Sequence, residues 1–277
     1  MSPQGREASS VIDRAPAVPG RRRDDALPPD FNLLAPFYRW MEWFSFGPWL
    51  GWCRCAFLDD LRNPRKVLVF GDGDGRFTAR LLRANPHAQA DAVDASSAML
   101  RALVRRAGAQ AAQVQTHCHD ARSWRPARGV RYHLVVTHFF LDCLTTAEVR
   151  ALAAQVRAAC APRALWLVSE FAIPQTRFGR RIARPLVGFL YWAFRVLTGL
   201  KVRRLPDHSA ALAEAGFVLL LRRYWLGGLL VSELWKRGAD RRSFASTPDS
   251  SMQNPVLDRS VGTKRIAIKR LQPDPPA

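Results

Sequence analysis

Strand-like and helix-like segments alternate along the middle of the chain. Short apolar runs bounded by turn residues are typical of buried strands, and such runs lie at 66–70, 89–94, 112–118, 132–138 and 164–170. Apolar residues at three- and four-residue spacing are typical of helices, and such stretches lie at 76–84, 96–107, 146–160 and 207–215. The alternation predicts an α/β fold with a mostly parallel sheet and helices on both faces.

Two further regions extend this pattern at its ends. Residues 217–225 and 229–236 are strand-like and are separated by Gly227 and Gly228, which predicts a hairpin that adds one antiparallel strand. Residues 31–62 carry apolar residues at helical spacing, with a second helical stretch at about 52–61.

We predict one domain, residues 30–237, between two terminal segments. Residues 1–29 and 238–277 are rich in proline and charge and lack an apolar period, so we expect a disordered head and a disordered basic tail. Within the domain, residues 30–62 form a helical cap. Residues 171–206 form a basic, amphipathic insertion that acts as a lid.

Charge adds a question to this outline. The formal net charge is +19, which indicates either anionic partners or an arginine-rich composition without functional meaning. The insertion at 171–206 holds eight basic residues and no acidic one, so contact with an anionic membrane surface is an alternative to a lid. The sequence has no long uncharged apolar run and no signal-peptide pattern, so we expect a cytoplasmic protein, with membrane association as the alternative.

The candidate chemistry lies where the first strand ends, in "VLVFGDGDGRF" at 67–77. Gly71, Gly73 and Gly75 allow a tight turn and close approach of a ligand to the backbone. Asp94 ends the next strand and Asp120 follows the third. A carboxylate at the first position can accept both hydroxyls of a ribose, and one at the second can accept a hydrogen bond from an adenine amine.

The glycine spacing discriminates between nucleotides. A dinucleotide turn requires GxGxxG, but here the third glycine comes one residue early and Arg76 occupies the sixth position. A P-loop requires GK[ST], which is missing from this turn. The remaining common ligand is S-adenosylmethionine (SAM), which has an adenosine and an amino-acid tail but no phosphate.

In this order the motifs resemble those of class I SAM-dependent methyltransferases. The matching stretches are "VLVFGDGDGRF", "DAVDASSAML", "HDARSW", "YHLVVTHFFLDCL", "ALWLVSEFAIP" and "LAEAGF". Over residues 33–236 the chain is most similar to the small-molecule branch that includes ubiquinone and menaquinone biosynthesis methyltransferases. The resemblance implies a Rossmann-like sheet of seven strands in the order 3-2-1-4-5-7-6, with strand 7 antiparallel.

The resemblance also implies where the cofactor binds. The three glycines would lie against its methionine moiety. The other contacts would be Asp94 at the ribose, Ala95 and Met99 flanking the adenine, Asp120 and Ala121 at the adenine edge, and Thr137 and His138 at the end of strand four. The family usually has an acid where this chain has Val69, and Asp72 or Asp74 would have to supply that charge.

Methyl transfer needs a base only if the acceptor carries a proton that is hard to remove. His138 could act as that base with Asp142 orienting it; in the alternative, His138 is a satisfied imidazole beside the site and Asp142 caps the next helix. We place the substrate pocket at Tyr38, Phe139 and Phe178. We expect no metal, because the adjacent residues of 117–119 (HCH) point to opposite faces of a strand.

The leading prediction is a SAM-dependent methyltransferase for a small apolar or aromatic molecule. A non-catalytic binding protein with the same fold is the second hypothesis, and Val69 would be its sign. A nucleic-acid methyltransferase is the third. Only the net charge favours it, because the [DNS]PP[YFW] clamp of base methyltransferases is missing. A nicotinamide-dependent oxidoreductase is disfavoured by Arg76.

Overall fold

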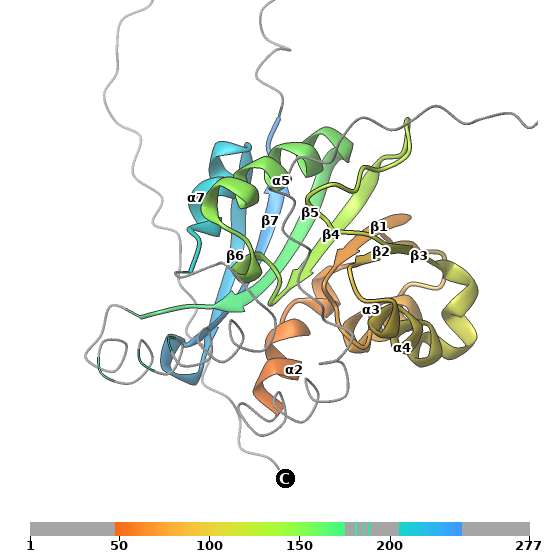
Figure 1. Ribbon diagram of the computed structural model, residues 1–277, viewed down its shortest axis with the longest axis horizontal. Helices are drawn as coiled ribbons and strands as arrows, with labels where there is room; N and C mark the ends of the chain where they lie inside the picture. Colours follow the sequence, from red (N-terminus) through yellow and green to blue (C-terminus); the bar gives the residue numbers. More distant parts are fainter. Residues whose placement is uncertain (1–47, 175–180, 182–184, 186–187, 189–204, 240–277) are drawn as a thin grey trace, which may run out of the picture. The chain divides into compact units, whose positions relative to one another are not determined.

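The computed structural model describes residues 48–174 and 205–239 and the isolated positions 181, 185 and 188 (Figure 1). The predictions for the head, for nearly all of the tail and for most of the insertion lie outside the described residues. So do the first 18 residues of the predicted cap, residues 30–47.

The seven strands form one sheet in the order β3-β2-β1-β4-β5-β7-β6. The first five strands pair in parallel, and β7 runs antiparallel to both β5 and β6. The predicted strand order and the antiparallel seventh strand are therefore confirmed. The strands are β1 (Lys66–Phe70), β2 (Gln89–Asp94), β3 (Val114–Cys118), β4 (Tyr132–His138), β5 (Cys160–Phe171), β6 (Phe217–Trp225) and β7 (Leu230–Arg237).

The described helices lie between these strands. The α-helices are α2 (Pro48–Arg54), α3 (Arg76–Ala84), α4 (Ser97–Ala107), α5 (Thr146–Ala159) and α7 (His208–Glu214). The 3-10 helices are η1 (Leu58–Asp60), η2 (Gly108–Gln113), η3 (Leu141–Cys143) and η5 (Leu226–Gly228). A Thr145–Glu148 capping box starts α5, and the Ser96 hydroxyl starts α4 by accepting the Met99 N–H.

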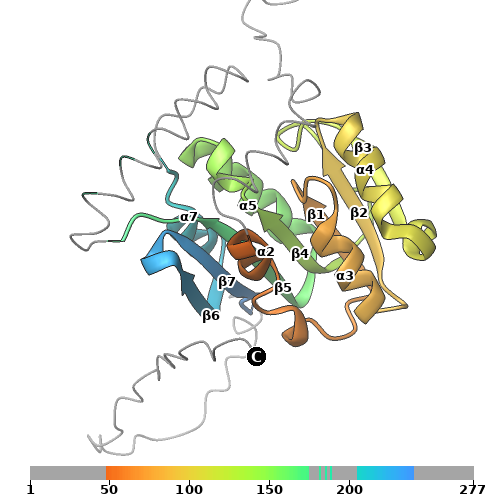
Figure 2. The same ribbon diagram turned by 90° about the horizontal axis from the view of Figure 1, so that it is seen from below.

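Alternation along the strands divides the core into two layers. Leu68 and Phe70 pack with α5 and α7, whereas Val67 and Val69 pack with α3 on the opposite face. Figure 2 shows α5 and α7 on one side of the sheet and α3 on the other. Burial of Val69 in this second layer means that the position of the family's usual acid holds a core side chain here.

Two predicted boundaries are wrong. The helical stretch expected at 52–61 is instead α2, which ends at Arg54, followed by η1. The chain must turn between them because Cys53 packs against the β6–β7 end of the sheet, whereas Phe57 packs under α3. Strand β5 starts at Cys160, before the expected 164, because Cys160 already pairs with Tyr132 of β4. A register shift separates this pair from the rest of the β4–β5 pairing.

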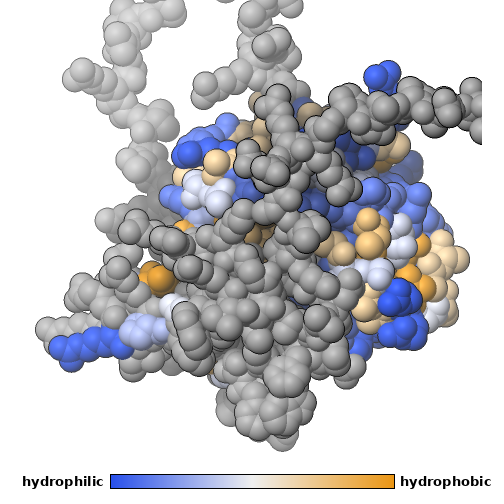
Figure 3. All heavy atoms as spheres, viewed as in Figure 1, coloured by the Kyte–Doolittle hydropathy of each residue, from blue (hydrophilic) through white to orange (hydrophobic). Residues whose placement is uncertain are grey.

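Among the described residues, no helix is long and apolar enough to cross a membrane. On the face shown in Figure 3, hydrophilic and hydrophobic residues are interspersed on the described surface. No disulfide joins the five cysteines, all of which the structure describes.

Helices α3 and α4 approach each other closely at Gly75. Its φ is +79°, and a Cβ there would lie 2.6 Å from Cγ and 2.8 Å from Cα of Leu103. The side chain of Arg106 in α4 also donates hydrogen bonds to the carbonyl and carboxylate of Asp74. The turn after β1 and the helix after β2 are thus packed as one unit.

We predict that Gly75→Ala lowers the free energy of unfolding by about 2–4 kcal/mol, because it adds a steric clash to a left-handed conformation. Gly129→Ala is the matched control, since Gly129 has a φ of +82° but no described atom within 4 Å of the added Cβ. The control should lose only about 1–2 kcal/mol. Urea denaturation measures both values, and equal losses would contradict the packing argument.

Candidate active site

The glycine turn is fixed by Asp72, which caps the start of α3. Its carboxylate accepts hydrogen bonds from the Thr78 N–H at 2.8 Å and the Thr78 hydroxyl at 2.7 Å. Burial raises the pKa of Asp72, and the positive charge of Arg54 and the Thr78 hydrogen bonds act in the opposite direction. Its second oxygen is buried and has no hydrogen-bond partner among the described residues.

The glycines of this turn have different surroundings. All three have φ between +57° and +79°. A Cβ on Gly71 would lie 2.8 Å from Phe140, whereas one on Gly73 would meet no described atom within 4 Å. Gly71 and Gly75 are therefore required by packing, and Gly73 is the one that faces open space.

Two arginines neutralise the Asp74 side chain, which follows Gly73 in the turn. Its carboxylate pairs with Arg106 at 2.7 Å and with Arg76 at 3.3 Å. Of the two loop acids proposed to replace the missing charge at Val69, Asp74 is thus neutralised by two arginines. Asp72, with an unused oxygen, is the better candidate.

Asp94 lies at the carboxyl end of β2, next to this turn. One of its oxygens accepts the Ser96 N–H at 2.8 Å. Burial raises the pKa of Asp94 to about 6, and the negative charge of Asp72 adds to the effect. Of its predicted neighbours, Ala95 is exposed and Met99 is buried.

Asp120 lies in the turn after β3 and is held by Arg122. The guanidinium of Arg122 contacts both carboxylate oxygens and also pairs with Glu148 of α5. Hydrogen bonds from Arg122 hold the pKa of Asp120 below its ordinary value. The next residue, Ala121, is buried in the core. A ligand amine at Asp120 would have to share the carboxylate with Arg122.

The two residues at the end of β4 point to opposite faces of the sheet. The Thr137 hydroxyl is fully buried and accepts a hydrogen bond from the Trp166 indole at 3.0 Å. The His138 ring packs against Phe77 of α3, with 4.6 Å between ring centroids. Neither nitrogen of His138 has a hydrogen-bond partner among the described residues.

This arrangement corrects both sequence-based descriptions of His138 and Asp142. Among the described residues no hydrogen bond satisfies the His138 ring, and none joins it to Asp142. Asp142 does not cap α5 either, because Thr145 does. Burial, and then the charge of Arg54, lowers the pKa of His138 well below its ordinary value, so the ring is neutral.

The carboxyl groups of Glu170 and Asp142 lie near the end of β4. Glu170, at the end of β5, accepts the N–H groups of Phe140 and Leu141 at 3.2 and 2.8 Å. Burial, and then the negative charge of Asp142, raises the pKa of Glu170 well above its ordinary value. Burial also raises the pKa of Asp142 to about 6. Glu170 was not predicted from the sequence, although it lies one residue before the end of β5, much as Asp94 ends β2.

Helix α2 is attached over the ends of β5 and β7. The Cys53 carbonyl accepts hydrogen bonds from the hydroxyls of Ser169 at 3.3 Å and Ser232 at 2.7 Å. The following residue, Arg54, is buried, with its guanidinium carbon 5.3 Å from the centre of the Phe139 ring. No sequence signal distinguishes Arg54 from the other arginines, and the analysis missed it.

Phe139 is part of an aromatic cluster at the ends of β4 and β5. Its φ is +51°, and its ring lies 5.2 Å from the ring of Phe171. Phe140 stacks on Phe70 at 5.6 Å. The other predicted pocket residues, Tyr38 and Phe178, lie outside the described residues.

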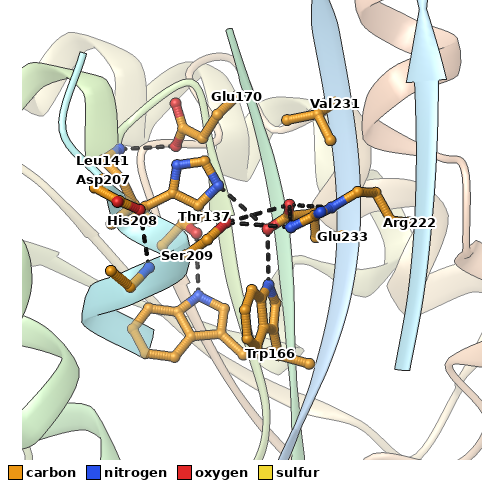
Figure 4. Close-up of polar contacts among 12 residues, drawn as sticks. Thr137, Leu141, Trp166, Glu170, Asp207, His208, Ser209, Arg222, Val231 and Glu233 are labelled. Atoms are coloured by element: carbon orange, nitrogen blue, oxygen red, sulfur yellow. Dashed lines mark hydrogen bonds and ion pairs between the residues drawn. The ribbon is translucent and has the colours of Figure 1, made fainter. Parts of the chain in front are cut away.

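A polar cluster behind this edge fixes α7 to the sheet. Figure 4 shows His208, Ser209 and Arg222 converging on Glu233 of β7. Arg222 and His208 lie 2.7 and 3.2 Å from its carboxylate. Although burial raises the pKa of Glu233, the hydrogen bond and charge of His208 and the charge of Arg222 leave it below its ordinary value. Glu233 thus stays ionised, and the cluster acts as a structural anchor.

The edge is therefore rich in carboxyl groups and aromatic rings. Asp72, Asp94, Asp142 and Glu170 lie at or after the carboxyl ends of β1, β2, β4 and β5. In a parallel sheet this is the edge at which ligands bind, at the switch point beside β1. Such an edge suits a ligand with positive charge and a ribose. The described residues contain no group of three or more potential metal ligands.

Comparison with protein families gives one match. Residues 67–163, from β1 into β5, match a family described as "Methyltransferase domain". A search of curated proteins found no match.

Solved methyltransferase structures share the fold. A protein from Nostoc punctiforme described as a putative O-methyltransferase has a TM-score of 0.57 and 19% identity, over 78% of this chain and 64% of that one. An O-methyltransferase family protein from Burkholderia thailandensis has a TM-score of 0.56 and 16% identity, over 73% and 59% of the two chains. The mitomycin 7-O-methyltransferase MmcR has a TM-score of 0.55 and 14% identity, over 75% and 60%.

The chain spans about three fifths of the length of these three structures. The strand order, the glycine turn and the matched domain agree with one another, and SAM is the cofactor of such domains. Residues 67–163 thus match a methyltransferase domain, and the sheet that contains them has the fold of solved methyltransferases.

Proposed function

We propose that the protein transfers the methyl group of SAM to a small apolar or aromatic molecule. The observation that carries the proposal is the set of aromatic rings at the ends of β4 and β5: Phe139 contacts Phe171, and Phe140 lies against Gly71 of the glycine turn. A methyl acceptor must approach the sulfonium from this side of the edge, and aromatic walls favour an apolar or aromatic acceptor.

In this proposal the carboxyl groups of the edge bind the cofactor. Asp94 accepts the ribose hydroxyls, because it ends β2 and, among the described residues, one of its oxygens accepts the Ser96 N–H. Gly73 lies against the methionine moiety, because a side chain there would occupy the open space. Asp72 supplies the negative charge opposite the cofactor's amino group in place of an acid at Val69.

Catalysis then comes mainly from positioning. Transfer is an in-line displacement at the sulfonium methyl, and holding the acceptor about 3 Å from that carbon supplies much of the rate. His138 is neutral and has no hydrogen-bond partner among the described residues, so it can accept a proton from an acidic acceptor such as a phenol. Its lowered pKa makes it a weak base, which favours acceptors whose proton is easily removed.

We predict that affinity for S-adenosylhomocysteine falls as the pH drops through about 6, the pKa of Asp94. The ribose hydroxyls donate to the ionised carboxylate, so protonation below this pH removes binding, by up to about tenfold per pH unit. Above about pH 7 Asp94 is ionised, so its titration should no longer change the affinity. Isothermal titration between pH 5 and 8 measures the profile.

Asp94→Asn separates this titration from those of the other carboxyls. The variant should bind about tenfold or more weakly at pH 8, because a charge-assisted hydrogen bond is lost. Its affinity should no longer change through pH 6. A variant that kept the wild-type pH profile would exclude Asp94 as the ribose ligand.

The methyl acceptor can be found by incubating the protein with cell extract and isotope-labelled SAM. We expect mass spectrometry to detect a labelled small, apolar or aromatic product with the wild type and a much weaker signal with Asp94→Asn. Tight binding of S-adenosylhomocysteine without any labelled product would instead favour a non-catalytic binding protein.

A further inference from the structure

A pocket lies between α2 and α3. Its volume is about 270 Å³. The described residues that line it are Pro48, Gly51, Trp52, Arg54 and Cys55 from α2 and the turn after it, and Arg76, Phe77 and Arg80 from α3. Neither the glycine turn nor Asp94 belongs to this lining.

The charged part of this lining is entirely basic. Three of its residues are arginines, and none of the described lining residues is acidic. Arg80 is exposed, and the contact of its guanidinium is with the Cys55 sulfur at 3.1 Å. Arg76 has a 3.3 Å contact with Asp74, whose shorter partner is Arg106. The guanidinium groups of Arg76 and Arg80 thus retain donors for an anion.

Aromatic rings form the rest of the wall. Trp52 is 50% exposed, and its ring is held edge-on to Trp49 with 4.8 Å between ring centroids. Phe77 is fully buried, and its ring also contacts His138. A large exposed indole beside guanidinium groups provides a surface on which a flat apolar group can pack.

We propose that the pocket between α2 and α3 binds a small aromatic molecule through a carboxylate or phosphate group. Guanidinium groups bind both anions by paired hydrogen bonds, and Trp52 and Phe77 contact the ring. SAM carries a sulfonium and an ammonium group against one carboxylate, so its net charge is positive and an arginine-lined pocket favours an anion over it. This inference does not rest on the proposed methyl transfer, because it concerns a ligand of the opposite charge and none of the residues that the proposed function assigns to the cofactor lines the pocket.

Isothermal titration with four probes tests the proposal at low ionic strength. The probes are benzoate, phenyl phosphate, inorganic phosphate and neutral benzyl alcohol. We expect benzoate or phenyl phosphate to bind, and benzyl alcohol not to bind. Binding of inorganic phosphate as tight as that of phenyl phosphate would overturn the aromatic part of the proposal, and equal binding of benzyl alcohol would overturn the anionic part.

Two variants of α3 test whether the anionic probe binds in this pocket. Arg80→Gln should weaken binding of the anionic probe about tenfold. Arg83→Gln is the matched control, because Arg83 is an exposed arginine of α3 that does not line the pocket. The proposal is overturned if no anionic probe binds the wild type, or if the two variants lose affinity equally.

Titration with S-adenosylhomocysteine distinguishes this inference from the proposed function. Arg80→Gln should bind that compound as the wild type does, which also shows that the variant is folded. Failure of the wild type to bind S-adenosylhomocysteine would contradict the proposed methyl transfer and leave the anion pocket untouched.

Discussion

The candidate site depends on one buried carboxylate, that of Asp72. By accepting both the N–H and the hydroxyl of Thr78, it joins the end of β1 to the first turn of α3. A buried charge is costly unless hydrogen bonds and opposite charges compensate it; here burial raises the pKa of Asp72, and Arg54 and Thr78 oppose that rise. The glycine turn between these points therefore has little freedom, and its conformation is set before any ligand binds.

Arg54 links this constraint to the rest of the edge. Its charge acts on both Asp72 and His138, and its guanidinium lies over Phe139. The helix that carries it is attached by the Cys53 carbonyl to hydroxyls on β5 and β7. One buried arginine thus partly offsets the acid of the glycine turn and adds to the burial that keeps the imidazole at the end of β4 neutral.

The sequence predicted the parts of the fold that depend on local pattern. The bounds of β1, β2 and β4 follow from short apolar runs, and those of α3 follow from helical spacing. Gly71 comes directly after β1, Asn85 comes directly after α3, and Asp94 is the last residue of β2. The same logic of acids at strand ends located Asp94, and applied to β5 it would have located Glu170. The end of α2 was not predictable in this way, because it depends on which of two distant clusters Cys53 and Phe57 join.

Side-chain partners were the least predictable part of the site. Asp72 and Asp74 are equivalent in the sequence, yet one caps a helix and the other pairs with Arg106 of α4. That difference arises because Gly75 brings α4 close to the turn, a tertiary contact with no local signature. The same contact gives Arg106 the shorter ion pair with Asp74 and leaves Arg76 with the longer one. The packing of α4 therefore determines how much of the positive charge of Arg76 stays unneutralised on the side of α3 that faces α2.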